Sequence, residues 1–185
     1  NSPNDLVVKS DGTVWFSDPD YGITSDYEGG RGEMELDGCH LYRIDPGDGR
    51  VEKMAGDFVK PNGLAFSPDE FVLYVSDTGH SGEKGGPPHI RRFQVAADNS
   101  LSGGEEFAVI DPPASDGFRV DESGNIWTSA GDGVHCISPD GVLVGKVLVP
   151  ERVSNVCFGG EKKTRLYITA TTSLYSIFLA VRGFR

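Results

Sequence analysis

The sequence predicts an all-β fold built from repeated blades of a β-propeller, and three observations support this prediction. Apolar runs of about four to seven residues, rich in aromatic and β-branched side chains, alternate with Gly, Pro, Asp and Ser. No long stretch has the apolar spacing of an amphipathic helix. One pattern occurs four times: a small polar residue with a side-chain oxygen begins an apolar run, and a second run follows after a turn. Repeated units of this kind are typical of propeller blades.

The first unit begins at Asn4 and contains four expected strands. We place them at about residues 5–9, 13–17, 39–45 and 50–55. Asp11-Gly12 predicts a tight turn between the first two strands, because glycine tolerates positive φ. Residues 18–38 form an insertion between the second and third strands, and we place substrate specificity in this loop and in its counterpart in the second unit.

The second unit begins at Asn62 and the third at Asp116. Four strands are expected in each unit, at about residues 63–67, 72–76, 89–95, 106–110 and at about residues 117–121, 125–129, 133–138, 142–148. Residues 77–88 are the second insertion. The last unit begins at Asn155 and has three expected strands, at about residues 155–158, 165–169 and 173–179.

The sequence lacks an obvious strand that would close the propeller by joining one terminus to the blade of the other. It begins at Asn1, without Met and already inside the repeat. We therefore expect residues 1–185 to be the C-terminal part of one larger propeller domain, with at least one further blade upstream. Open sheet edges would otherwise promote aggregation.

Charge and composition exclude several classes of partner. The 185 residues include 28 acidic and 17 basic side chains, which gives a net charge of −11. This charge argues against binding to nucleic acid and against an electrostatic anchor on an anionic membrane. No apolar stretch approaches the roughly 18–20 residues of a membrane span. The sequence leaves the oligomeric state open.

The three cysteines are Cys39, Cys136 and Cys157, and they have no CxxC spacing. Each lies in an apolar strand context, so we expect all three to be buried free thiols. Free thiols favour a reducing compartment and therefore a cytoplasmic location. A periplasmic location stays open, because the sequence does not begin with Met.

The four repeat openings predict a cation site. Asn amides and an Asp carboxylate are hard oxygen donors that suit Ca²⁺ or Mg²⁺, and Mn²⁺ or Zn²⁺ stays open. Side chains at the starts of innermost strands meet at the propeller axis. Asn62 and Asp116 are the strongest candidates, Asn4 comes next and Asn155 is peripheral. The alternative interpretation is that these residues satisfy their own backbone in turns, as Asn and Asp often do before a strand.

Other catalytic arrangements do not fit the sequence. Gly79-His80-Ser81-Gly82 lacks the spacing of a serine-hydrolase nucleophile elbow. The four histidines have no zinc-ligand spacing, and we interpret them as packing or surface residues: His40, His80, His89 and His135.

With these motifs the chain resembles the SMP-30/gluconolactonase/luciferin-regenerating-like family of six-bladed propellers, most of all its bacterial gluconolactonase-type members. The resemblance covers nearly the whole chain. It depends on four stretches in the same order: SPNDLVVKSDGTVWFSDPDYGI, KPNGLAFSPDEFVLYVSDTG, SDGFRVDESGNIWTSAGDGVHCISPDG and SNVCFGGEKKTRLYITATTSLYSI.

The resemblance implies a divalent cation, foremost Ca²⁺, in the central channel. Family members bind it with a Glu from an early blade, two Asn and one Asp. Asn62 and Asp116 match ligands, and Asn4 matches an Asn that lies at the metal or touches substrate. The early Glu has no counterpart in this sequence. Ser2 stands where some animal members have Arg, so their substrate contacts do not transfer directly.

The implied function is metal-dependent hydrolysis of a sugar lactone, in which the cation polarises the lactone carbonyl for attack by water. Asp116 is the candidate both to bind the ion and to assist proton transfer. Candidates for substrate contact are Asn4, Asp5, Asp18, Tyr21 and Asn155, with Tyr21 covering the channel mouth and stacking on a sugar face. Two alternatives stay open: a non-catalytic binding propeller with a structural cation, and hydrolysis of phosphotriesters or other esters.

Overall fold

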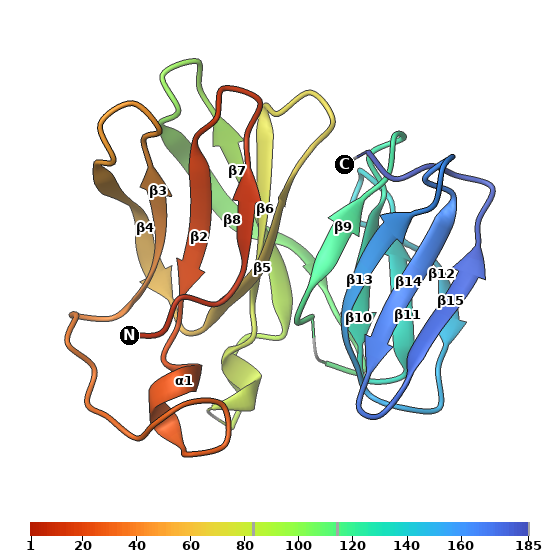
Figure 1. The fold of residues 1–185 in the computed structure, drawn as a ribbon, viewed down its shortest axis with the longest axis horizontal. Helices are drawn as coiled ribbons and strands as arrows, with labels where there is room; N and C mark the ends of the chain where they lie inside the picture. Colours follow the sequence, from red (N-terminus) through yellow and green to blue (C-terminus); the bar gives the residue numbers. More distant parts are fainter. Residues whose placement is uncertain (83, 114, 185) are drawn as a thin grey trace.

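The chain folds into four antiparallel sheets that are arranged as consecutive blades of a β-propeller (Figure 1). The computed structural model describes residues 1–82, 84–113 and 115–184. Each blade is a simple meander, in which strands follow one another in sequence order. The prediction of an all-β propeller with about four blades in this chain is confirmed.

The strand bounds agree closely with the expected positions. Blade 1 consists of β1 (Leu6–Val8), β2 (Val14–Asp18), β3 (Cys39–Ile44) and β4 (Val51–Phe58). Blade 2 consists of β5 (Pro61–Phe66), β6 (Val72–Asp77), β7 (His89–Val95) and β8 (Leu101–Val109). Blade 3 consists of β9 (Phe118–Val120), β10 (Ile126–Ala130), β11 (Gly133–Ile137) and β12 (Leu143–Leu148). Blade 4 consists of β13 (Val153–Gly159), β14 (Arg165–Ala170) and β15 (Leu174–Phe178).

Strand β8 departs from the prediction, since it begins at Leu101 instead of near residue 106. The reason is a bulge in its pairing with β7, between Arg92 and Phe93. Gly103 and Gly104 have φ values of 84° and 93°, which glycine adopts without strain. This glycine-rich segment has the composition of a loop, and the bulge allows it to pair as part of the sheet.

The two insertions lie at the end of the propeller where the innermost strands begin. The first contains the short helix α1 (Tyr21–Thr24), and the second contains the 3₁₀ turn η1 (Gly79–Ser81). Both lie at the lower edge of the molecule in Figure 1. Neither helix among the described residues is long and apolar enough to cross a membrane.

The hydrophobic core lies between neighbouring blades and not within any one sheet. Trp15 and Leu64 belong to the cluster between blades 1 and 2, and Phe118 lies in the cluster between blades 2 and 3. Leu166 belongs to the cluster between blades 3 and 4. Each blade therefore depends on its neighbour to bury an apolar face, and burial of a large side chain contributes roughly 1.5–3 kcal/mol.

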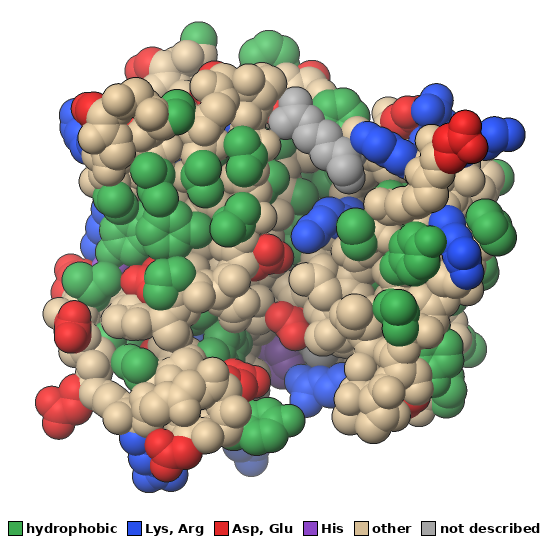
Figure 2. Space-filling view, viewed as in Figure 1, with side chains coloured by type: hydrophobic (Ala, Val, Ile, Leu, Met, Phe, Trp, Pro, Cys, Tyr) green, Lys and Arg blue, Asp and Glu red, His purple; other side chains and the backbone are tan. Residues whose placement is uncertain are grey.

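The outward faces of the first and last blades keep apolar side chains exposed. Leu6 is 56% exposed in blade 1, and Phe178 is 73% exposed in blade 4. Figure 2 shows hydrophobic side chains gathered over the sheet of blade 1.

The burial of free thiols is confirmed for Cys39 and Cys136, but the prediction for Cys157 is wrong, because this side chain is exposed. In β13 buried and accessible positions alternate, and Cys157 lies on the face that does not pack against blade 3.

Candidate functional site

The four repeat openings lie next to one another at one end of the innermost strands. Strands β1, β5, β9 and β13 are neighbours in this order. Asn4 precedes β1, Asn62 is the second residue of β5, Asp116 precedes β9, and Asn155 lies near the start of β13. The repeat therefore brings these residues from distant sequence positions to a common edge, as the pattern predicts.

Backbone hydrogen bonds join three of these openings directly. The N–H of Gly63 donates to the carbonyl oxygen of Asp116 at 2.9 Å, and the N–H of Gly117 donates to the carbonyl oxygen of Ser154 at 2.8 Å. A Cβ at position 63 would lie 2.3 Å from that Asp116 oxygen. A Cβ at position 117 would lie 2.2 Å from the amide of Asn155. The glycines that follow Asn62 and Asp116 thus permit the close approach of the inner strands.

A polar hollow of about 700 Å³ lies over these openings, between α1, η1 and the starts of β9 and β13. Figure 2 shows a furrow between the two halves of the molecule, where acidic, basic and histidine side chains are visible. Four predicted site residues line the hollow: Asn4, Tyr21, Asn62 and Asp116. This volume is in the range of small-molecule sites.

Asp116 is a partly buried carboxylate with an unusual protonation equilibrium. Its pKa is raised to about 6, mainly by burial and to a smaller extent by the nearby charges of Asp5 and Glu28. A hydrogen bond from Asn62 and the charge of Arg152 act in the opposite direction. A carboxylate that has lost solvent in this way gains from a nearby cation.

Asn62 is buried, with 6% of its surface exposed. Its Nδ2 lies 3.4 Å from Oγ1 of Thr78, and its amide also hydrogen-bonds to the Asp116 carboxylate. Both hydrogen bonds use Nδ2, so Oδ1 takes part in neither of them.

The donor set suits a hard cation. Asp116 supplies a desolvated carboxylate, Asn62 a buried amide, and Asn4 an exposed amide on the same hollow. Among residues 1–82, 84–113 and 115–184, no three His, Cys, Asp or Glu side chains form a group that suits a metal ion. A cation in this hollow would therefore depend on amide oxygens.

Asp5, Asp18 and Asn155 do not line the hollow. Burial raises the pKa of Asp5, and the nearby Arg119, at 3.9 Å, lowers it. Asn155 Oδ1 accepts the N–H of Val156 at 2.8 Å. Their proposed substrate contacts stay predictions.

Asp18 is the last residue of β2, and Asp77 takes the same place in β6. The Asp77 carboxylate accepts the N–H groups of Val59 at 3.0 Å and Lys60 at 2.8 Å. The Asp18 side chain is 4% exposed, and burial raises its pKa. Oδ1 of Asp18 is nevertheless buried without a hydrogen-bond partner among the described residues, so Asp18 differs from Asp77 in its contacts. Its proposed contact with substrate stays a prediction.

Several residues of the hollow are not among the sequence candidates. They come from the two insertions and from the segment before β13: Tyr27, Glu28, Thr78, His80, Ser81 and Arg152. His80, which the sequence analysis interprets as a packing or surface residue, has a buried Nδ1 without a hydrogen-bond partner among the described residues. The insertions are visible in the sequence as interruptions of the repeat, but their side chains carry no spacing signal that assigns them to the hollow.

Comparison with known proteins identifies relatives over nearly the whole chain. The model of the SMP-30/gluconolactonase/LRE-like region matches residues 1–172. The gluconolactonase of Zymomonas mobilis is 34% identical over 192 aligned positions, which cover 96% of this chain and 50% of that protein. The chain therefore spans about half the length of this curated relative.

Two solved structures have the same architecture. A putative gluconolactonase superposes with a TM-score of 0.91 at 45% identity, and covers 100% of this chain and 61% of its own. A gluconolactonase from Xanthomonas campestris superposes with a TM-score of 0.86 at 37% identity, over 99% of this chain and 57% of its own. The repeat, the propeller architecture and these matches agree, and the chain belongs to the SMP-30/gluconolactonase/LRE-like family.

Proposed function

We propose that the protein hydrolyses a sugar lactone with the help of a divalent cation, foremost Ca²⁺. The observation that carries the proposal is the pairing of Asn62 and Asp116 at the base of a polar hollow, in a member of a family that includes gluconolactonases. Residues 1–185 are proposed to be part of a single propeller domain.

Asn62, Asp116 and Asn4 would hold the cation, since their side chains share the hollow. When bound, the cation supplies Lewis acidity that polarises a lactone carbonyl. Hydrolysis then adds the oxygen of water to the carbonyl carbon, the ring C–O bond breaks, and the ring oxygen takes a proton to give a hydroxy acid.

Asp116 is the proposed acceptor of the proton from water. A cation bound to this carboxylate would lower its basicity. His80 is therefore the alternative acceptor, because this residue lines the same hollow and its Nδ1 has no hydrogen-bond partner among the described residues. Both Asp116 and His80 line the hollow that the proposed cation ligands also line.

The proposed substrate is a small, polar, hydroxylated lactone. Hydroxyl, amide and charged side chains line the hollow, and these groups hydrogen-bond sugar hydroxyls better than they accommodate an apolar ester. Contacts from Tyr21, Asn4, Asp5, Asp18 and Asn155 to substrate are part of the proposal. A cytoplasmic location is proposed from the free thiols of Cys39 and Cys136.

The test is acid release from gluconolactone in a pH-stat, corrected for spontaneous hydrolysis, before and after treatment with EDTA. We expect EDTA to abolish the enzymatic rate and Ca²⁺ to restore it, with Mg²⁺, Mn²⁺ and Zn²⁺ compared in parallel. Absence of cation-dependent acid release on a panel of lactones would contradict the proposal. Cation binding without hydrolysis of any lactone, ester or phosphotriester would favour a binding propeller.

A further inference from the structure

Thr78 lies directly beside the proposed cation ligand Asn62. It follows the last residue of β6, and its N–H donates to the carbonyl oxygen of Lys60 at 2.9 Å, which places it at the start of β5. Its side chain is 4% exposed. A buried hydroxyl at this place meets few groups, so its hydrogen bonds can be accounted for one by one.

The Thr78 hydroxyl has one hydrogen and two lone pairs. The hydroxyl lies 3.2 Å from the carbonyl oxygen of Lys60, which can only accept, and 2.5 Å from the hydroxyl of Tyr21, which can donate or accept. These two contacts use the single hydrogen. Nδ2 of Asn62, at 3.4 Å, carries only hydrogens and therefore donates to Thr78.

This arrangement determines which way the Asn62 amide faces. A flipped amide would place Oδ1 against the Thr78 oxygen, which has no hydrogen left to give. It would also place Oδ1 against the Asp116 carboxylate, which now accepts from the amide. Two acceptors on one side of the amide thus hold Nδ2 toward them and turn Oδ1 away.

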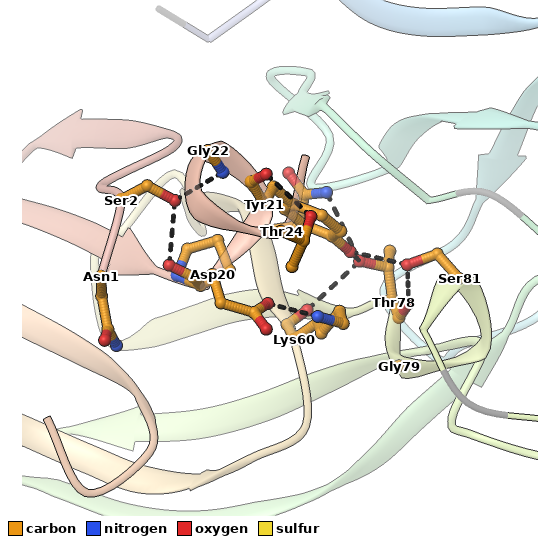
Figure 3. Close-up of polar contacts among 12 residues, drawn as sticks. Asn1, Ser2, Asp20, Tyr21, Gly22, Thr24, Lys60, Thr78, Gly79 and Ser81 are labelled. Atoms are coloured by element: carbon orange, nitrogen blue, oxygen red, sulfur yellow. Dashed lines mark hydrogen bonds and ion pairs between the residues drawn. The ribbon is translucent and has the colours of Figure 1, made fainter. Parts of the chain in front are cut away.

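The two insertions hold Thr78 in place. Figure 3 shows Tyr21, Thr78 and Ser81 pointing toward one another, with Lys60 and Asp20 beside them. The Tyr21 hydroxyl lies 2.9 Å from Oγ of Ser81, and the Lys60 ammonium lies 5.1 Å from the centre of the Tyr21 ring. Lys60 also forms an ion pair with Asp20, the residue before Tyr21. The segment just before β5 and the two insertions therefore contact one another around the Thr78 hydroxyl.

We infer that Thr78 is a positioning residue, which orients the Asn62 amide so that Oδ1 is available to a divalent cation, and that Tyr21 fixes Thr78 in this role. The inference rests on the proposed function, because it requires a cation in the hollow. It gives Tyr21 a structural task at the hollow wall in addition to the proposed contact with substrate.

The test compares Ca²⁺ affinity by calorimetry in the protein at its natural length, for wild type, Thr78→Val and Thr78→Ser. Thr78→Val keeps the shape but removes the acceptor, and we expect about tenfold weaker binding, the size of one lost buried hydrogen bond. Thr78→Ser keeps the hydroxyl and should stay within about twofold of wild type. Tyr21→Phe should weaken binding by less than Thr78→Val, because the Thr78 oxygen remains.

A matched control separates positioning from general stability. Thr13 is also a buried threonine, and its Oγ1 bonds Asp11 at 2.7 Å and Trp15 Nε1 at 3.0 Å within blade 1. Thr13→Val should lower the melting temperature by the same amount with and without EDTA, and should leave Ca²⁺ affinity unchanged. Thr78→Val should lower the melting temperature in EDTA as well, because it also loses buried hydrogen bonds, and in addition the stabilisation by added Ca²⁺ should decrease.

The outcomes are distinguishable. Equal Ca²⁺ affinity in wild type and Thr78→Val would overturn this inference alone. Equal losses in Thr78→Val and Thr78→Ser would also overturn it, since the hydroxyl would then be irrelevant. A wild-type protein that binds none of Ca²⁺, Mg²⁺, Mn²⁺ and Zn²⁺ would overturn the inference together with the proposed cation dependence.

Discussion

The openings of blades 2 and 4 use the same residues at the same repeat positions and differ in environment. Thr171 follows β14 as Thr78 follows β6, and its N–H donates to the Arg152 carbonyl oxygen at 3.1 Å. Its hydroxyl lies 3.4 Å from that same oxygen, and the Thr78 hydroxyl likewise lies 3.2 Å from the Lys60 carbonyl oxygen. Thr78 is nevertheless buried, whereas Thr171 is exposed.

The asparagines of the two blades differ in the same way. Asn62 keeps Oδ1 out of its contacts with Thr78 and Asp116, whereas Asn155 uses Oδ1 to accept the N–H of Val156. The insertion that contains Tyr21 reaches the opening of blade 2, where the Tyr21 hydroxyl forms a hydrogen bond with Thr78. The comparison teaches that the repeat sets the position of each side chain, and that the inserted loops decide its chemistry.

The largest effect is expected for Asp116→Ala, which removes the carboxylate that accepts a hydrogen bond from Asn62 of blade 2. Lactone hydrolysis should fall by at least about 100-fold, since the protein would lose both the charged ligand and the proposed proton acceptor. Initial rates at saturating Ca²⁺ measure this. Full activity in this variant would show that the site lies elsewhere.

The second prediction compares Asn62→Ala with Asn155→Ala. Of these two residues, Asn62 lines the hollow and Asn155 uses its Oδ1 to accept the N–H of Val156. Asn62→Ala should therefore weaken Ca²⁺ binding by about tenfold to 100-fold, and Asn155→Ala by less than about threefold. Calorimetric titration of both variants measures the difference. Similar losses would remove the distinction between blades 2 and 4.

The third prediction concerns the close approach of the inner strands. Gly63→Ala places a Cβ 2.3 Å from the Asp116 carbonyl oxygen. The backbone cannot move away without breaking the hydrogen bond from the Gly63 N–H to the same oxygen. The free energy of unfolding should decrease by about 1–3 kcal/mol. Gly145→Ala is the control, because no atom lies within 4 Å of its added Cβ. Denaturant titration should show that the control is nearly neutral.

The smallest effect concerns the pH dependence of blade 4. Hydrogen bonds from Ser173, the N–H of Thr172 and Tyr175 lower the pKa of Glu151 to about 2, from an ordinary value of 4.5. A lowered folded-state pKa stabilises the protein above pH 4.5, and this contribution disappears as the pH falls through 4.5 toward 2.

Wild type should therefore lose stability relative to Glu151→Gln as the pH falls over this range. Denaturant titrations at several pH values measure the difference, which should be small because Glu151 is accessible to solvent. A difference that stays constant with pH would contradict the assignment.

The sequence predicted the strands well, because blade strands carry local signals. β-Branched and aromatic runs, and glycine turns such as Asp11-Gly12, define hairpins without reference to the rest of the chain. The exposure of Cys157 was predicted wrongly, since an apolar neighbourhood in sequence does not say which sheet face a side chain occupies. The substrate contact of Asp18 stays a prediction, since this residue is not among those that line the hollow.

The sequence by itself determined the blade repeat, the family, and the pairing of Asn62 with Asp116 at the inner strand starts, because these depend on short motifs at repeated positions. Only the tertiary structure decided which equivalent residues share an environment. Tyr21 and Thr78 are far apart in sequence and belong to different insertions, yet their hydroxyls are 2.5 Å apart. No periodic pattern encodes such a contact, since it depends on how two irregular loops pack over the same strand opening.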